Sequence, residues 1–147
     1  MAAIAELMDV NTLSRGECLR LLAAGSIGRV VCTDGALPSA EPVSYLLDDE
    51  EIVFRAGTGS RLAAAARDAV VAFQADAFDV ATATGWSVLG VGKAYEVTGD
   101  DRVLALTSQH QLVHTHGHHA HVIAIPLWRL SGRRLMVSGP AGEPGPP

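Results

Sequence analysis

Three strand-like segments that follow one another without an intervening helix constrain the fold of this 147-residue chain most strongly. They cover residues 27–32, 40–47 and 52–55, and only short turns at Asp34-Gly35 and Asp48-Asp49-Glu50 separate them. A parallel sheet requires a helical crossover after nearly every strand, so this succession predicts an antiparallel meander. The fold class that we predict is therefore mainly β.

Capping signals predict short helices between the strands. Ser14 and Glu17 form a capping box, and Gly25 supplies a stop signal after an apolar run, so a helix is expected between Ser14 and Gly25. Ser60 caps an alanine-rich helix expected over 60–67, and another helix is expected over 101–108.

Further strands are expected over residues 69–75, 86–98, 122–125 and 127–137. Gly90 and Gly92 interrupt the second of these and predict a bend or bulge. Six to seven antiparallel strands with short helices between them favour a β-barrel.

The length favours one domain, which we expect over residues 1–137. Residues 138–147 are rich in glycine and proline and are expected to form a disordered tail. The first ten residues are expected to be a partly ordered lead-in.

The composition and charge of the chain indicate which partners to expect. Hydrophobic residues make up 48% of the chain and charged residues only 18%, so we expect an apolar surface to be buried against a second copy. The formal net charge is −5 and no basic run is present, which argues against a nucleic-acid partner.

No apolar run reaches the roughly 18 residues that a membrane span requires, and no basic segment followed by an apolar one marks a secretion signal. Cys18 and Cys32 show no CxxC spacing and are expected to be buried free thiols. These features indicate the cytoplasm.

The segment from Phe54 to Leu62, Phe-Arg-Ala-Gly-Thr-Gly-Ser-Arg-Leu, carries the clearest chemical signal. Arg55 ends a strand, the glycines permit a tight turn, and Ser60 opens a helix with Arg61 in its first turn. A helix N-terminus and guanidinium groups both suit a phosphate, and an anion would offset the unfavourable position of Arg61 near the positive end of the helix dipole. The alternative is a plain strand–turn–helix whose arginines pair with surface carboxylates.

A cluster of histidines falls in the connection before a late strand: His110, His114, His116, His118, His119 and His121. No cysteine or close carboxylate accompanies them, so we interpret the segment as a solvated loop and predict no metal site. Contact with a metal or a haem, or proton donation near a cofactor, are the alternatives.

Residues 14–134 resemble the pyridoxamine 5′-phosphate oxidase-like, FMN-binding split-barrel family. The matching motifs occur in the family's order and spacing: Glu41-Pro-Val-Ser-Tyr45, Ile52-Val-Phe-Arg55, Gly59-Ser-Arg-Leu-Ala63, Val71-Ala-Phe-Gln-Ala-Asp76, Gly85-Trp-Ser-Val88, Gly92-Lys-Ala94 and Ser131-Gly-Arg-Arg134.

The resemblance implies a homodimer with FMN in a groove at the interface. Arg55, Ser60 and Arg61 would hold the phosphate, the strand segment Val43-Ser44-Tyr45 would lie along the isoalloxazine ring, and Arg133 or Arg134 would come from the partner. The cofactor-binding set implied in this way comprises Val43, Ser44, Tyr45, Arg55, Ala56, Ser60, Arg61, Trp86, Ser87 and Arg133. Tyr45 and Trp86 would be the aromatic neighbours of the ring.

The function implied is an FMN-dependent oxidoreductase that reduces a small molecule. The segment 132–137 lacks the Arg-Leu-x-Pro-like ending of true pyridoxamine-phosphate oxidases, which argues against that activity. The sequence contains no Ser–His–Asp set that would suggest hydrolysis, and a flavin itself supplies the redox chemistry. The alternatives are a non-enzymatic module that binds or stores a flavin, a deazaflavin or a haem, and a metal-binding protein that uses the histidines.

Overall fold

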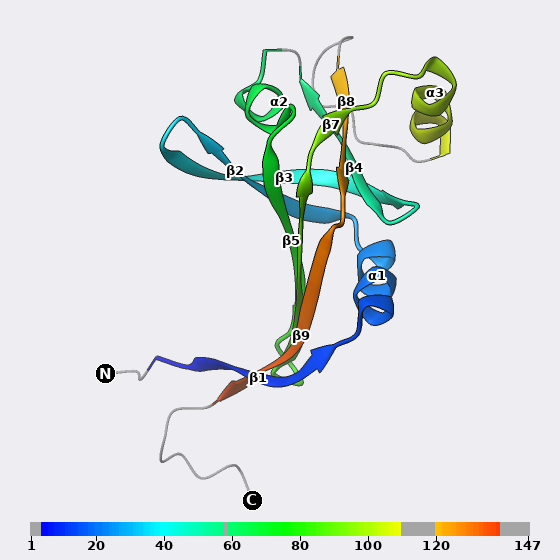
Figure 1. Ribbon diagram of the computed structural model, residues 1–147. Helices are drawn as coiled ribbons and strands as arrows, with labels where there is room; N and C mark the ends of the chain where they lie inside the picture. The colour runs from blue at the N-terminus through cyan, green and yellow to red at the C-terminus, as the bar shows by residue number, and fades with distance from the viewer. Residues whose placement is uncertain (1–3, 58, 110–119, 139–147) are drawn as a thin grey trace, which may run out of the picture.

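A computed structural model describes residues 4–57, 59–109 and 120–138 and shows one antiparallel sheet with three short helices (Figure 1). The strands are β1 (Glu6–Leu13), β2 (Ile27–Asp34), β3 (Leu37–Asp48), β4 (Glu51–Gly57), β5 (Val70–Asp79), β6 (Thr84–Lys93), β7 (Tyr95–Glu96), β8 (Ala120–Pro126) and β9 (Arg129–Ser138). The helices are α1 (Arg15–Ala24), α2 (Arg61–Ala66) and α3 (Asp100–Gln109). The prediction of a mainly β, antiparallel fold is confirmed.

The strand order across the sheet is β1-β9-β6-β5-β2-β3-β4-β8-β7. Strands β2, β3 and β4 form the expected meander of consecutive neighbours. The sheet coils so that β6 passes close to β8, although the two strands are not hydrogen-bonded neighbours. A Cβ atom built on Gly92 of β6 would lie 1.7 Å from the carbonyl oxygen of Pro126, so only glycine permits this approach.

The described residues form nine strands, where the sequence predicted six or seven. One additional strand is β1, which lies where a partly ordered lead-in was expected. It pairs with β9, for example Thr12 with Arg133, and the register shifts between Asp9 and Asn11 as at a β-bulge. Ser138, assigned to the disordered tail from the sequence, ends β9, and its hydroxyl donates to the carbonyl oxygen of Glu6.

The other difference is that the strand expected over 86–98 is two strands. β6 ends at Lys93, and Ala94 forms backbone hydrogen bonds with the segment between α2 and β5. β7 then pairs with β8 on the other side of the barrel. The register of β6 continues without a shift through Gly90 and Gly92, so no bulge occurs there, and both glycines permit close packing, against Leu127 and Pro126.

Helix α1 has the boundaries that the sequence predicted. The Ser14 hydroxyl accepts from the backbone N–H of Glu17, and the Glu17 carboxylate accepts from the backbone N–H of Ser14. Gly25 follows the last turn, and its N–H donates to the carbonyl oxygen of Leu22. The helix buries Cys18 and Leu22 against the sheet.

The main core is formed by side chains of the sheet together with α1 and α2. Phe54 and Phe73 are its largest fully buried side chains, and the ring of Phe73 meets that of Tyr45 edge to face with a centroid distance of 4.7 Å. The absence of a side chain at Gly28 makes room for Phe73, because a Cβ atom there would lie 2.1 Å from its ring.

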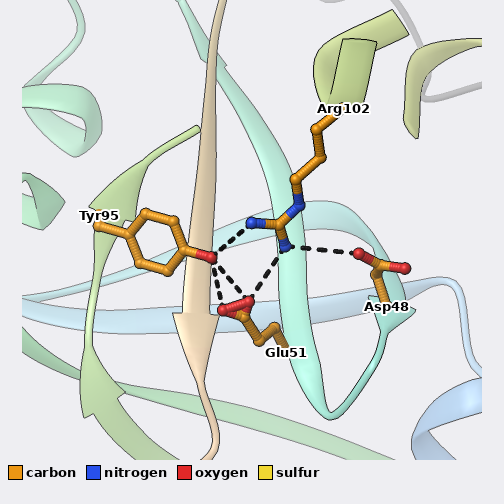
Figure 2. A network of polar contacts seen from close by, with 4 residues as sticks. All are labelled: Asp48, Glu51, Tyr95 and Arg102. Carbon is orange, nitrogen blue, oxygen red and sulfur yellow. Dashed lines mark hydrogen bonds and ion pairs between the residues drawn. The ribbon is translucent and has the colours of Figure 1, made fainter. Parts of the chain in front are cut away.

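Four polar residues anchor α3 to the barrel, as Figure 2 shows. The Tyr95 hydroxyl donates to Glu51, and the Arg102 guanidinium donates to the Tyr95 oxygen at 2.7 Å and to Glu51 at 3.1 Å. A longer contact of 3.4 Å joins Arg102 to Asp48. Burial and the hydrogen bond to Glu51 raise the pKa of Tyr95, and the hydrogen bond to Tyr95 raises the pKa of Arg102. This network connects a helix that the sequence places far along the chain to the turn between β3 and β4.

Candidate functional site

A cavity of about 400 Å³ lies between β3, the end of β4 and the start of α2. This volume falls within the range of roughly 300–1,000 Å³ that is typical of small-molecule sites. The lining residues are Ile27, Glu41, Pro42, Val43, Ser44, Arg55, Ala56, Gly57, Ser60 and Leu62. Five of the ten predicted cofactor-binding residues therefore meet here: Val43, Ser44, Arg55, Ala56 and Ser60. We refer to it as the Arg55 cavity.

The charge in this cavity comes from one cation and one carboxylate, Arg55 and Glu41. Arg55 lies near the end of β4, in register with Val122 of β8, and its Nε atom is buried. Because its position is fixed by two neighbouring strands, its guanidinium is suited to hold an anionic group. Glu41 is exposed on β3 and would disfavour an anion placed directly against it.

Ser60 forms the edge of the cavity at the start of α2. Its hydroxyl accepts from the backbone N–H of Ala63, and its own N–H donates to the carbonyl oxygen of Gly57, which closes the turn. Gly59 makes this turn possible with a φ of +77°. Because α2 has only six residues and Ser60 already satisfies one of its first N–H groups, the helix contributes less to anion binding than the sequence suggested.

Arg61 does not line the Arg55 cavity. Its side chain is 90% exposed, and its Nε lies 3.9 Å from a carboxylate oxygen of Asp34. It lines a neighbouring cavity of about 200 Å³, the Arg61 cavity, with Cys32, Asp34, Leu37, Pro38, Ser39, Glu41 and Leu62. The first turn of α2 thus directs Arg61 toward the β2–β3 hairpin, so the two arginines that were predicted to share one phosphate occupy adjacent cavities.

The side chain of Tyr45 points into the core, which differs from its predicted place beside a cofactor ring. It is only 5% exposed, and its hydroxyl donates to the carbonyl oxygen of Leu22 in α1 at 2.7 Å. The reason is strand alternation: Val43 and Tyr45 are buried, and the half-buried Ser44 between them pairs with exposed Ile27. Burial raises the pKa of Tyr45 to about 12.

The remaining predicted residues lie elsewhere on the sheet. Ser87 and Arg133, which are paired across β6 and β9, line a cavity of about 520 Å³. Trp86 points to the opposite face and lines another cavity, of about 500 Å³, with Phe78 and Arg134. The Arg133 guanidinium forms an ion pair with Asp9 of β1 at 2.8 Å. Within one chain, the Arg55 cavity is therefore not lined by Trp86, Ser87 or Arg133.

The predicted cofactor-binding set lacked five residues that the fold brings to the Arg55 cavity: Ile27, Glu41, Pro42, Gly57 and Leu62. The register of the β2–β3 hairpin, which places Ile27 opposite Ser44, could have identified the first of them. Glu41 was noted only as the start of a motif.

Of the histidine cluster, only His121 falls within the described residues. It is the second residue of β8 and lies opposite Ala56, and its Nδ1 contacts Glu96, which also pairs with Arg67 at 3.6 Å. The interpretation of the other five histidines as a loop lies outside the described residues. In the part of the chain that the structure describes, no three His, Cys, Asp or Glu side chains are placed to hold a metal ion.

Cys18 and Cys32 are buried free thiols, as predicted, and burial raises the pKa of each. Among the described residues, no helix has the length and apolar character needed to cross a bilayer.

Comparisons with known proteins identify relatives. Residues 14–134 match the family model described as pyridoxamine 5′-phosphate oxidase. An uncharacterized protein of Mycobacterium tuberculosis is 39% identical over 100 residues, which is 65% of this chain and 66%, just under two thirds, of that protein.

Two solved structures are similar over most of the chain. The FAD binding protein from Mycobacterium smegmatis superposes with a TM-score of 0.78 at 28% identity, covering 86% of this chain and 98% of that one. The FAD and heme binding protein from the same organism gives a TM-score of 0.69 at 17% identity, covering 90% and 76% of the two chains. The second likeness concerns the fold alone.

Proposed function

Because the chain belongs to the pyridoxamine 5′-phosphate oxidase family, we propose that it binds a flavin nucleotide in the Arg55 cavity and acts as a flavin-dependent reductase of a small molecule. The observation that carries this proposal is the convergence of Arg55, Ser60 and Ser44 on one cavity of suitable volume. Arg55 would bind the flavin phosphate, and the strand carrying Val43 and Ser44 would face the isoalloxazine ring.

Two flavin nucleotides, FMN and FAD, are compatible with this assignment. The sequence predicted FMN, whereas a relative that is 28% identical is an FAD binding protein. FAD contains the whole FMN unit, so a site for the FMN phosphate and ring serves both. FMN therefore remains a prediction, and the common unit is what we assign to the Arg55 cavity.

The residues of the cavity suit a protein that leaves the redox step to its cofactor. When bound, a flavin accepts and donates hydride or single electrons. The apolar side chains of Ile27, Val43 and Leu62 line part of the cavity and shield it from water. The chain's own part is then to bind the flavin, orient it and limit its access to solvent.

We further propose that the working unit is a homodimer. The sheet face that carries Ile27 also carries Val31 and Leu89, which are 59%, 37% and 42% exposed. The three residues share this face because Val31 pairs with Ala72, while Arg29 pairs with Gln74 and Gln74 in turn pairs with Leu89, so the polar Arg29 and Gln74 lie among the apolar side chains. A second copy packed on this face would bury these three apolar side chains and bring its Ser87 and Arg133 toward the Arg55 cavity of the first.

The test of dimerisation is the molar mass in solution. Wild-type protein is expected to elute at twice the chain mass in size-exclusion chromatography with light scattering. Leu89→Lys is expected to shift the protein toward monomer, because it replaces an apolar side chain of this face with a charged one. Leu104→Lys, at a 67% exposed position on α3, is the control. A monomeric wild type would contradict the proposal.

Flavin binding is tested with riboflavin and FMN, which differ only by the phosphate. Arg55→Gln is expected to weaken FMN binding by about tenfold or more, because a charge-assisted hydrogen bond contributes about 1.5–3 kcal/mol. Its effect on riboflavin should be small, and Arg20→Gln, on the exposed side of α1, should leave both affinities unchanged. Equal losses for both ligands would mean that Arg55 does not bind the phosphate.

The reductase assignment is tested by stopped-flow reduction of the loaded protein with NADH or NADPH, followed by an electron acceptor. Turnover supports the enzyme. Failure with every donor and acceptor pair favours the alternative, a module that stores its cofactor. The absorbance spectrum of the purified protein distinguishes a flavin from a deazaflavin or a haem.

For the location, we retain the cytoplasm as a proposal. The two buried free thiols, Cys18 and Cys32, are compatible with a reducing compartment. Fractionation of cells expressing the tagged chain tests it.

A further inference from the structure

One cavity of the sheet takes no part in the proposed function. It has a volume of about 500 Å³, and we refer to it as the Trp86 cavity. Three of its lining residues form one row, since Ala77 of β5 pairs with Trp86 of β6, which in turn pairs with Arg134 of β9. Opposed residues point to the same face of a sheet, so a small side chain, an aromatic ring and a cation lie next to one another there. By strand alternation this is the face opposite Ser87 and Arg133.

The Trp86 cavity begins where α1 stops covering this face. Gly132 lies on the same face two residues before Arg134, and a Cβ atom on it would lie 2.6 Å from the Sγ atom of Cys18 in α1. The helix therefore packs directly on the sheet at Gly132. One row further, Ala77 and Arg134 are exposed, and Trp86 is half-buried and packed partly against the core. The core thus holds the indole in place while a ligand can reach its open side.

The charges in this cavity suit a singly charged anion. Arg134 forms no ion pair within the described part of the chain, whereas the adjacent Arg133 pairs with Asp9 at 2.8 Å. Of the described residues that line the cavity, Asp79 alone is acidic, and one of its oxygens accepts from the backbone N–H of Ala81 at 2.9 Å. The Arg134 guanidinium can form two parallel hydrogen bonds with a carboxylate. A doubly charged phosphate would be repelled more strongly by Asp79.

The indole of Trp86 supplies an aromatic surface beside this cation. The Cβ atoms of opposed residues lie about 4.5–5.5 Å apart, so one planar molecule can contact the indole and the neighbouring guanidinium together. Ala77 leaves space on the other side of the indole. Met8 and Met136 follow in the next row of the same face and are 46% and 43% exposed, and thioether side chains adapt well to aromatic ligands. The cavity therefore combines a flat apolar surface with a single anion-binding group.

We propose that the Trp86 cavity is a second ligand site, which binds an aromatic carboxylate with its ring on Trp86 and its carboxylate on Arg134. The site is independent of the flavin, because the Trp86 and Arg55 cavities share no lining residue. A second copy packed on the face of Ile27 and Leu89 would leave the indole accessible. Trp86 then has a role distinct from that of the ring neighbour predicted from the sequence.

The probe is 2-naphthoate, and the measurement is the indole N–H signal of each tryptophan in heteronuclear NMR spectra of the isotope-labelled full chain. Trp128, which is 62% exposed between β8 and β9, is the internal control, and Trp128→Phe assigns the two signals. Naphthoate is expected to shift the Trp86 signal with a Kd of about 1 mM or below and to leave the Trp128 signal in place. The uncharged analogue naphthamide is expected to bind about tenfold more weakly.

Two arginine variants test the carboxylate contact. Arg134→Gln is expected to weaken naphthoate binding about tenfold, because it removes a charge-assisted hydrogen bond, and to change naphthamide binding little. Arg129→Gln, at another exposed position of β9, is the matched control and should change neither affinity. Added FMN should not displace naphthoate, because the flavin is assigned to the Arg55 cavity.

A saturable shift confined to Trp86, weakened by Arg134→Gln but not by Arg129→Gln, supports the second site. The inference is overturned if naphthoate leaves the Trp86 signal unchanged or shifts both indole signals alike. It is also overturned if Arg134→Gln binds naphthoate as tightly as wild type does, or if FMN displaces the probe.

Discussion

Replacing Tyr45 by phenylalanine separates the role that the structure gives this residue from the one that the sequence suggested. The substitution keeps the ring against Phe73 and removes only the hydroxyl that donates to the carbonyl oxygen of Leu22 at 2.7 Å. That oxygen also accepts from the N–H of Gly25 at 3.2 Å, so it does not lose its last partner. We therefore expect a loss of about 1 kcal/mol in the free energy of unfolding, the usual contribution of one buried hydrogen bond. For a chain of this size, that corresponds to a fall in Tm of roughly 2–4 °C.

The pH dependence of the same pair of proteins gives an independent check. Burial raises the pKa of Tyr45 to about 12 from 10.0, so the folded protein keeps this proton after the unfolded chain has lost it. The contribution of the hydroxyl is complete below pH 10 and is lost as the pH rises from 10 to 12. At pH 11 this loss is about 1.4 kcal/mol. The hydrogen bond's contribution is then cancelled, and wild type and Tyr45→Phe should be about equally stable.

Urea unfolding of both proteins at pH 8 and pH 11 measures these differences, and titration with FMN measures the binding. Tyr95 titrates in both proteins, so its contribution cancels in the comparison. The FMN affinity is expected to be unchanged in Tyr45→Phe. If the variant is as stable as wild type at pH 8 but binds FMN more weakly, the ring faces the cofactor and the burial argument is refuted.

Two further predictions concern the packing of the barrel. Gly92→Ala should destabilise the protein by about 3 kcal/mol or more in urea unfolding, because its Cβ would meet the backbone oxygen of Pro126 at 1.7 Å. Gly16→Ala, which has no atom within 4 Å of its Cβ, should instead be neutral or stabilise α1 by about 0.5–1 kcal/mol; equal effects would contradict the contact between β6 and β8. Arg102→Gln should cost about 1 kcal/mol and speed amide hydrogen exchange in α3 but not in α1, since it removes the contact with Tyr95. Unchanged exchange in α3 would show that the network does not hold the helix.

The features that the sequence predicted correctly depend on near neighbours in the chain. The boundaries of α1 follow from Ser14, Glu17 and Gly25, all within or beside the helix. The meander of β2, β3 and β4 follows from two tight turns. The grouping of Arg55 with Ser60 follows from the single turn between them, and the resemblance to a family added Val43 and Ser44.

The features that could not be predicted depend on distant partners. β1 exists because its backbone pairs with β9, near the other end of the chain. Arg61 points to Asp34 because the β2–β3 hairpin lies beside α2, which no local pattern reveals. Tyr45 was expected beside the cofactor, but its side chain lies in the core. The motif Glu41-Pro-Val-Ser-Tyr45 shows that a strand is present but does not show which of its side chains point into the core.

The shifted register of β1 has a consequence for how this protein behaves when crowded. β1 is a terminal strand of the sheet that the described residues form, and Leu7, Met8 and Val10 on it are 57%, 46% and 57% exposed, so an identical strand could pair with its outer edge. The irregularity between Asp9 and Asn11 breaks the ladder that an incoming strand would need. The terminal strand β1 thus combines exposed apolar side chains with a bulge that disfavours edge-to-edge pairing between identical molecules.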